Sequence, residues 1–354
     1  MLELQARPQA SATMRYASPL IAAALTVIGG FVVFLLLGRD PVQGFAVFFL
    51  RPLDSLYGVA ELLLKATPLA LIAIGLAVGF RANVWNIGAE GQFVLGAIAA
   101  SGVALYLPGT ESRWVVLTLM LLAGAIGGML WAAIPALLKT RFNASEILVS
   151  LMLVYIAKLF VSWLVFGPWK DPEGFNFPQT RMFADSALLP VLIQGTRLNL
   201  SFPLMLAALA AGHVFMQRSF VGFQTLVAGE SEAAARYAGF SARRAVWIGL
   251  LAGGAASGMA GMAEVAGPMG QLTANVSSNY GFAAIIVAFV GRLHPVGILL
   301  ASLLMSLLYL GGEQAQQVLN LPSSISNVFQ GMLLFFLLGT DVLINYRLRR
   351  RAVA

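Results

Sequence analysis

The chain has 354 residues, of which 59% are apolar and only 10% are charged. Ordinary soluble domains carry about a quarter charged residues, so this composition excludes a water-soluble globular protein. The net charge of +7 would suit nucleic-acid binding in a soluble protein, but here the basic residues stand in short segments between apolar runs, which is typical of a membrane protein.

Windows of about 20 apolar residues, the length that crosses a bilayer as a helix, recur along the chain. They predict helices at residues 18–38, 59–80, 87–107, 114–138, 146–167, 200–217, 244–264, 281–291, 296–313 and 325–342. The eighth window is too short to cross a bilayer by itself, so we expect a half-helix or a re-entrant segment there. The sequence thus predicts an all-α polytopic membrane bundle of about ten transmembrane helices, with residues 1–354 forming a single domain.

The basic residues between these windows predict the orientation. With the N-terminus inside, fourteen Lys and Arg residues fall on one side and six on the other. Basic residues collect on the cytoplasmic side, so we expect both termini in the cytoplasm. Residues 168–199 then form a proline-containing extracytoplasmic loop of turns or short surface helices, and residues 219–243 form the only long cytoplasmic loop.

The cytoplasmic loop carries the signals of a short helix. Ser231 is a helix-capping residue type, Glu232 would lie next to the positive end of the helix dipole, and Gly239 is a typical terminator. Ser241 is expected to cap the following span. A helix held at both ends would transmit force from a protein that grips the small side chains of residues 233–235. A plain surface helix with alanine fillers explains the same pattern.

Several polar residues fall at membrane depth, where they are costly unless they face a cavity or a partner. Asn86 and Glu90 are four residues apart and are expected to share a helix face, while Gly88 and Gly91 allow close approach of a helix or a solute. Two interpretations stay open. The two side chains line a solute pathway, or Asn86 caps the helix and Glu90 bonds to another helix; Gln92 points to a different face.

Lys158 lies in the middle of its predicted span with no acidic residue four positions before or after it. Its partner must therefore come from another helix, and we expect Glu90. Asn279 and Tyr280, just before the short eighth helix, could offer hydrogen bonds and stacking to a solute, but aromatic residues are also common near membrane interfaces. The two histidines, His213 and His294, stand alone without any metal-binding spacing, so no metal site and no catalytic site is expected.

Glycines mark a further feature of the seventh span. Gly254 and Gly258 are four apart, accompanied by Gly253, Ser257 and Gly261. This small-residue pattern predicts a seam of close helix packing rather than chemistry.

Two segments resemble a known family. Gly229–Gly239, followed by Ala252–Gly267, resembles the coupling segment of type II ABC importer permeases of the branched-chain amino acid and simple-sugar group. The octet WNIGAEGQ, Trp85 to Gln92, is similar to the signature of nucleoside and simple-sugar permeases that work with basic-membrane-protein-type binding proteins. The resemblance covers most of the chain from about residue 58. Val154 departs from it, because such permeases often have Asn at that position.

The resemblance implies the type II ABC importer permease fold and a permease subunit of an ATP-driven importer for nucleosides, related simple sugars or nucleobases. The expected location is the bacterial plasma (inner) membrane. The resemblance implies a chain without enzymatic activity or cofactor, since ATP and Mg would bind a separate cytoplasmic ATP-binding subunit. The absence of any Gly-Lys dipeptide agrees, because the usual phosphate-binding loop requires one. Further expected partners are a second homologous permease subunit in a heterodimer, an extracytoplasmic substrate-binding protein and membrane lipid, but no nucleic acid.

The resemblance also implies two sets of functional residues. Those expected along the substrate pathway are Trp85, Asn86, Glu90, Gln92, Lys158, Asn279 and Tyr280. Those expected to couple the chain to the ATP-binding subunit are Glu230, Glu232, Ala233, Ala234, Arg236, Tyr237 and Gly239. The alternative from the residues alone is a proton-coupled secondary transporter of small polar solutes, in which Glu90, Glu264 or Lys158 carries the proton.

Overall fold

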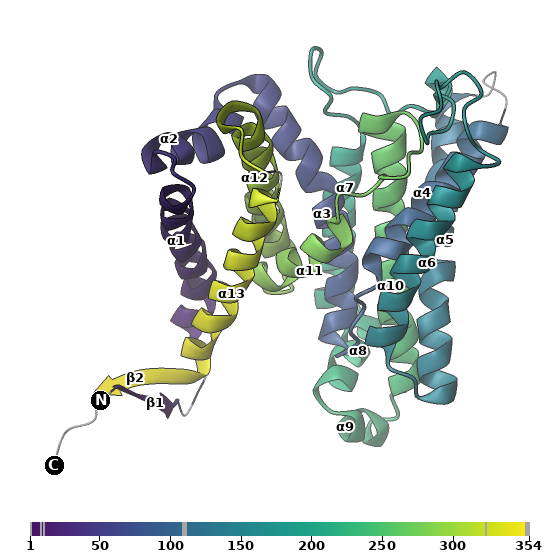
Figure 1. The fold of residues 1–354 in the computed structure, drawn as a ribbon. Coiled ribbons are helices and arrows are strands. Elements are labelled where there is room, and N and C mark those ends of the chain that lie inside the picture. Colours follow the sequence, from purple (N-terminus) through teal and green to yellow (C-terminus); the bar gives the residue numbers. More distant parts are fainter. Residues whose placement is uncertain (1, 8, 10, 108–111, 323, 351–354) are drawn as a thin grey trace. The chain divides into compact units, whose positions relative to one another are not determined.

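The structure is a computed structural model and describes residues 2–7, 9, 11–107, 112–322 and 324–350. In these residues nearly all regular structure is helical (Figure 1). The helices are α1 (Ala12–Leu36), α2 (Pro41–Phe45), α3 (Leu56–Arg81), α4 (Ala89–Tyr106), α5 (Arg113–Phe142), α6 (Glu146–Phe166), α7 (Ser201–Arg218), α8 (Phe220–Glu230), α9 (Glu232–Tyr237), α10 (Ala242–Glu264), α11 (Tyr280–Val290), α12 (Pro295–Leu319) and α13 (Ile325–Asn345). Two strands, β1 (Leu2–Ala6) and β2 (Tyr346–Arg350), are also present, as are four short 3-10 or π-helical segments, Ala46–Leu50, Arg51–Leu53, Asp185–Ala187 and Val265–Met269.

Each of the ten predicted helices is present. In the described residues, eight helices are long and apolar enough to cross a membrane, and nine if α7 and α8, bent by 69° at Ser219, count as one broken span. The prediction of about ten exceeds this number because it included the eighth window. That window is α11, which has only 11 residues and is as short as expected. The fold is a polytopic helical membrane bundle.

The chain divides into two compact units, one of residues 1–62 and 304–354 and one of residues 63–303. The helices α3 and α12 each run from one unit into the other. In the first unit α1 packs along α13. Its core contains Phe34, Phe48 and Phe329, with the rings of Phe48 and Phe329 stacked at 4.3 Å between centroids.

The strands β1 and β2 form an antiparallel ribbon that no sequence signal predicts (Figure 1). Leu2 pairs with Arg350 and Ala6 with Tyr346, so two segments at opposite ends of the described chain lie side by side. The guanidinium of Arg347 donates two hydrogen bonds to Oε1 of Gln5, at 3.1 and 2.9 Å. Each strand has only five residues. An alternation of apolar and polar residues over so short a run cannot be distinguished from the end of an apolar helix.

The second unit is built on α4, α5, α6 and α10 (Figure 1). Glycines let α5 and α10 approach each other closely. A Cβ atom added to Gly254 would lie 2.5 Å from the carbonyl oxygen of Gly128, and one on Gly258 would meet the backbone of Gly124. Gly261 lies equally close to the backbone of Phe93 in α4. The predicted glycine seam is confirmed, and it packs α4, the helix that carries Glu90 and Gln92, against α5 and α10.

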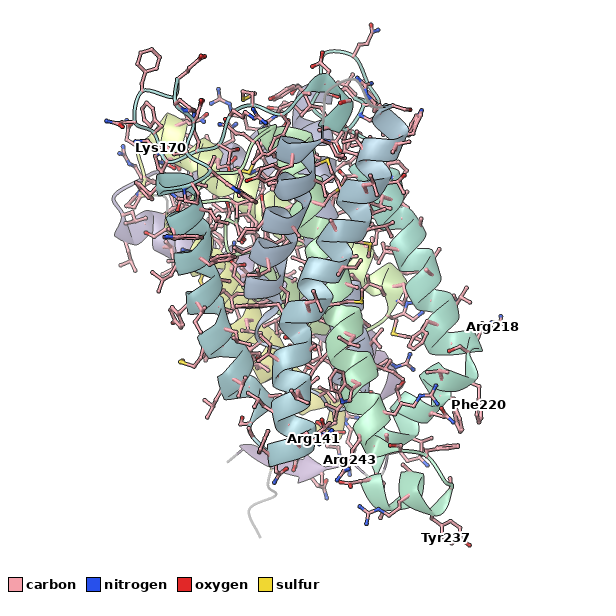
Figure 2. All side chains as sticks on the ribbon, turned by 90° about the vertical axis from the view of Figure 1, so that its right-hand side faces the viewer. Arg141, Lys170, Arg218, Phe220, Tyr237 and Arg243 are labelled. Atoms are coloured by element: carbon pink, nitrogen blue, oxygen red, sulfur yellow. The ribbon has the colours of Figure 1, made fainter. Side chains whose placement is uncertain are left out.

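The proline-containing loop, residues 168–199, consists of turns, one short 3-10 helix (Asp185–Ala187) and two isolated β-bridges, as expected. Thr180 is buried and its hydroxyl accepts a hydrogen bond of 3.1 Å from the backbone N–H of Leu272. Figure 2 shows Lys170 of this loop at one end of the second unit and Tyr237 at the opposite end.

Candidate functional site

The segment that precedes α4 is not helical. Asn86 and Gln92 are both buried, and their side-chain amides bond to each other twice, with the Nδ2 of Asn86 donating at 2.9 Å and the Nε2 of Gln92 donating at 3.1 Å. The Oδ1 of Asn86 also accepts from the backbone N–H of Gly88 at 3.1 Å. The expectation that Asn86 and Glu90 share a helix face is therefore wrong, because α4 begins only at Ala89. Gln92 is instead the partner of Asn86.

Glu90, in the first turn of α4, is fully buried. Its Oε2 accepts a hydrogen bond of 2.8 Å from the backbone N–H of Gly281, in the first turn of α11. A carboxylate at that position satisfies a helix N–H that has no partner within its own helix, and it is favoured by the helix dipole. Glu90 thus caps a short helix that is about 190 residues away in sequence, as the interhelical interpretation requires.

Lys158 in α6 supplies the opposite charge. Its Nζ lies 3.4 Å from Oε1 of Glu90, which confirms the predicted pair. The same Nζ donates a hydrogen bond of 3.2 Å to Oδ1 of Asn279 and lies 6.0 Å from the centre of the Phe282 ring. The lysine side chain is 43% exposed in the isolated chain, whereas the glutamate side chain has no exposed surface. Three separate helical regions therefore meet at one ion pair.

Two glycines of the octet allow α6 to approach α4. A Cβ on Gly88 would lie 2.7 Å from the Cβ of Ser150, and one on Gly91 would lie 3.1 Å from the Cα of Val154. Val154 is buried in this helix contact. The close approach is thus made by a neighbouring helix, and the missing Asn at position 154 does not remove a hydrogen bond from an open surface of this chain.

Aromatic rings surround the same region. Trp85 is partly exposed and stacks on Phe289 of α11, with 5.7 Å between ring centroids, and its Nε1 donates to Oδ1 of Asn83 at 3.1 Å. Tyr280 is buried and meets Phe93 edge to face at 6.0 Å. Of the seven residues assigned to the pathway, Glu90, Lys158 and Asn279 meet at the ion pair, while Asn86 bonds to Gln92. Trp85, Lys158 and Asn279 are the members with substantial exposure.

The predicted cytoplasmic helix is present as α9. The hydroxyl of Ser231 accepts a hydrogen bond of 3.3 Å from the N–H of Ala234, and Gly239 adopts a left-handed backbone conformation, φ +77°. The hydroxyl of Ser241 accepts a hydrogen bond from the N–H of Arg244, also at 3.3 Å, and so caps α10 as predicted. Glu232 and Arg236 form an ion pair of 2.9 Å along the helix surface.

The orientation of α9 corrects one expectation. Ala235 is fully buried, so it anchors the helix in its own chain and cannot belong to a surface that another protein grips. Ala233 and Ala234 are exposed, and Tyr237 is 96% exposed at the tip of the unit (Figure 2). Phe240, just after α9, packs edge to face against Phe220 of α8 at 5.8 Å. The helix α9 therefore presents an exposed surface while it is anchored to its own chain.

Sequence reasoning missed several contributors to these clusters. Gly281 and Phe289 lie in an apolar run with no local signal for either contact. The helix α8 lies where the sequence predicts loop, and Ser219 caps it by accepting a hydrogen bond of 2.9 Å from the N–H of Gly222. The two histidines, expected to stand alone, meet with their ring centroids 5.8 Å apart. No group of three or more metal-binding side chains occurs among the described residues.

Comparison with known proteins places the chain in a family. Residues 58–338 match the family described as the branched-chain amino acid transport system permease component. A protein of Haloferax volcanii named glucose ABC transporter permease is 34% identical over 98% of this chain and 93% of its own length. A guanosine ABC transporter permease of Bacillus subtilis is 30% identical over 90% and 91%, respectively. A nucleoside ABC transporter permease of Lactococcus lactis is 28% identical over 92% and 91%. With the family pattern over most of its length, this multi-pass membrane chain belongs to the family of branched-chain amino acid transport system permease components.

Proposed function

We propose that this chain is the membrane-spanning permease subunit of an ATP-driven ABC importer for nucleosides or related sugars and nucleobases. The names of its relatives, which refer to guanosine, nucleosides and glucose, support this substrate class. These are polar solutes that hydrogen-bond without needing a counter-charge. The pairing of Lys158 with Glu90 fits such cargo, because the ammonium charge at the candidate site is already compensated within the chain.

The proposal includes the partners. A cytoplasmic ATP-binding subunit would hold ATP and Mg, a second homologous permease would complete the transmembrane pathway, and an extracytoplasmic binding protein would deliver the solute. Catalysis of ATP hydrolysis is assigned to the partner, since this chain has no Gly-Lys dipeptide for a phosphate-binding loop. The chain lies in the bacterial inner membrane with both termini in the cytoplasm, as the distribution of basic residues favours.

The observation that carries the proposal is the geometry of α9. It is capped at its start by Ser231, packed through Ala235 and exposed through Ala233, Ala234 and Tyr237. We assign coupling to its exposed surface and the adjoining Glu230, Glu232, Arg236 and Gly239. The helices α8 and α10 directly precede and follow α9, so a displacement of α9 is transmitted to the transmembrane helices without a long linker between them.

Within the pathway we assign two roles. Trp85, Lys158 and Asn279, which have exposed surface, would contact the solute. Asn86, Glu90, Gln92 and Tyr280 are buried and would hold those residues and α11 in place.

A substitution in α9 tests the coupling. In proteoliposomes that contain the complete transporter, Ala234→Arg should reduce ATP-dependent uptake at least tenfold while the protein still inserts and assembles its fold. Ala184→Arg, the same change at an exposed residue of the 168–199 loop, is the matched control and should transport at the wild-type rate. Wild-type uptake by the Ala234→Arg complex would refute the coupling role of α9.

The energy source distinguishes an ATP-driven importer from a proton-coupled secondary transporter. The ion pair between Glu90 and Lys158 would also suit the second kind of protein. Uptake into vesicles should stop with vanadate and persist with a protonophore. Uptake by the purified chain alone, or inhibition by the protonophore only, would favour the secondary transporter instead.

A further inference from the structure

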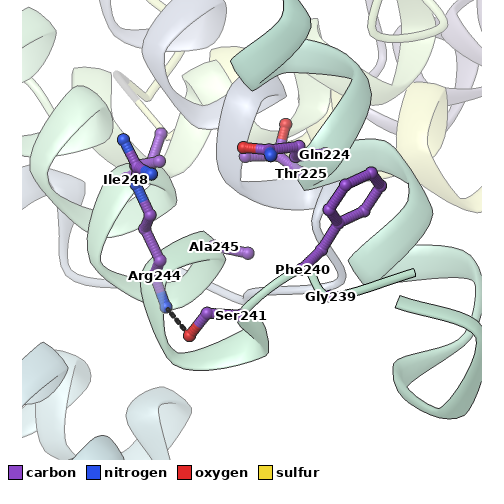
Figure 3. Close-up of a pocket in the computed structure, with 8 residues that line it drawn as sticks. All are labelled: Gln224, Thr225, Gly239, Phe240, Ser241, Arg244, Ala245 and Ile248. Atoms are coloured by element: carbon purple, nitrogen blue, oxygen red, sulfur yellow. Dashed lines mark hydrogen bonds between the residues drawn. The ribbon is translucent and has the colours of Figure 1, made fainter. Parts of the chain in front are cut away.

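A small pocket lies beside the start of α10, where the chain returns from α9. Its lining comes from three consecutive segments, α8, the turn after α9 and the first turns of α10 (Figure 3). The lining residues are Gln224, Thr225, Gly239, Phe240, Ser241, Arg244, Ala245 and Ile248. Phe240 forms one wall and Arg244 the opposite wall, with Gln224 and Thr225 between them (Figure 3).

The size of the pocket limits its occupant. The volume is about 110 Å³, whereas sites for nucleotides and drug-sized ligands enclose about 300–1,000 Å³. The pocket therefore suits the end of one side chain. Thr225 and Ala245 are buried and give the pocket a solid floor, while Ser241 and Arg244 are exposed at its opening.

The charge of the pocket indicates the chemistry of that side chain. Among the described residues, the guanidinium of Arg244 makes no hydrogen bond or ion pair, while the nearby Arg236 is neutralised by Glu232 at 2.9 Å. Arg244 also lies in the first turn of α10, where the helix dipole opposes a positive charge. An unpaired arginine in that position favours an incoming carboxylate, which its planar group can bind through two parallel hydrogen bonds.

We propose that this pocket receives an aspartate or glutamate side chain of the ATP-binding subunit, which binds Arg244. The inference rests on the proposed function, because α9 must dock on that subunit to bring a carboxylate here. Continuity supports it: Gly239, Phe240 and Ser241 join α9 to α10, so a protein that covers α9 also reaches the opening of the pocket. The contact would fix the position of the ATP-binding subunit on the permease, while α9 transmits the motion of that subunit to the membrane helices.

The test compares two adjacent arginines in the complete transporter. Arg244→Gln should weaken binding of the ATP-binding subunit to the permease in nanodiscs at least tenfold at moderate salt, and Arg244→Lys should recover part of the loss. Arg243→Gln is the matched control, because Arg243 is exposed, equally unpaired in the described residues and not part of the pocket. It should bind within twofold of wild type. Both substitutions remove a cation from the first turn of α10, so neither should destabilise that helix.

A second measurement identifies the occupant. A photo-crosslinking residue at position 224, which lines the pocket, should capture a peptide of the ATP-binding subunit that contains an acidic residue. Replacing that acidic residue by Arg should weaken binding of the subunit, and Arg244→Glu in the permease should restore it. Equal binding by the Arg244→Gln and Arg243→Gln proteins would overturn the proposal, as would crosslinks only to lipid or to the second permease. If the proposed function itself is wrong, the wild-type chain will not bind the ATP-binding subunit at all. If only this inference is wrong, the wild-type chain will bind the ATP-binding subunit and Ala234→Arg will still reduce uptake at least tenfold.

Discussion

Glu90 and Lys158 form an ion pair whose two members are buried to very different extents. The carboxylate has no exposed surface and also accepts the N–H of Gly281, whereas the lysine side chain is 43% exposed. A charge is most costly where it is buried without a partner. Removing Lys158 and removing Glu90 should therefore change the stability of the protein by different amounts, although both residues belong to one ion pair.

We predict that Lys158→Met destabilises the protein more than Glu90→Gln does. Loss of the lysine leaves a buried carboxylate, which typically costs about 3–5 kcal/mol. The amide of Glu90→Gln still accepts from Gly281 and leaves a half-exposed lysine, so the cost should be nearer the roughly 1 kcal/mol of one hydrogen bond. Thermal unfolding in detergent measures both, and the double variant should unfold at a higher temperature than Lys158→Met alone. Equal losses from the two single variants would contradict this asymmetry.

At this scale the sequence predicts part of the site. The lack of a local acidic partner correctly indicates that Lys158 pairs across helices, since hydrocarbon does not tolerate an isolated ammonium. The pairing of Asn86 with Gln92 could not be predicted from spacing, because a helical repeat was assumed where the backbone turns before α4. Contacts to a backbone N–H, such as that of Gly281, have no residue signature at all.

Among the helical elements, α5 and α10 depend on the glycines between them. Gly258 faces the backbone of Gly124 and Gly128, so an added methyl group has no flexible side chain to displace. By contrast, at Gly339 in α13 a Cβ would meet no described atom within 4 Å beyond the backbone of its own helix. Replacing glycine by alanine should therefore lower the stability of the protein at position 258 but not at position 339.

Gly258→Ala should reduce stability by about 1–3 kcal/mol, the usual range for overpacking, and should lower the yield of folded protein. Gly339→Ala serves as the control and should leave the unfolding temperature unchanged or slightly raised, because alanine is the better helix former. Unfolding monitored by circular dichroism in detergent compares the two. A neutral Gly258→Ala substitution would mean that α5 and α10 can separate freely.

The elements themselves were largely predictable, since a run of apolar residues long enough to cross a bilayer has few alternatives to a helix. The three capping serines, at positions 219, 231 and 241, explain where α8, α9 and α10 begin, but only the last two were recognised. Ser219 is not predicted as a cap because the polar pair Gln217 and Arg218 marks the end of a span, and residues 219–243 are then expected to be a loop. Ser219 stands at the 69° bend between α7 and α8.

For the molecule as a whole, the second unit has a polarity that can be tested directly. Lys170 and Tyr237 lie at its opposite ends (Figure 2). The chain contains no cysteine, so a single introduced thiol reports its own position. In intact cells, a membrane-impermeant maleimide should label Lys170→Cys and should label Tyr237→Cys only after permeabilisation. The reverse pattern would show that the distribution of basic residues misassigns the cytoplasmic side.

The ribbon of β1 and β2 has a practical consequence for protein engineering. Leu2 pairs with Arg350 and Ala6 with Tyr346, and among the described residues each strand has only the other as its partner in the sheet. Trimming one of them leaves the other as an orphan edge, open to association with foreign strands. Researchers who shorten this chain for crystallisation should remove both segments or neither, and a brief glycine bridge between them offers a route to a circularly permuted version.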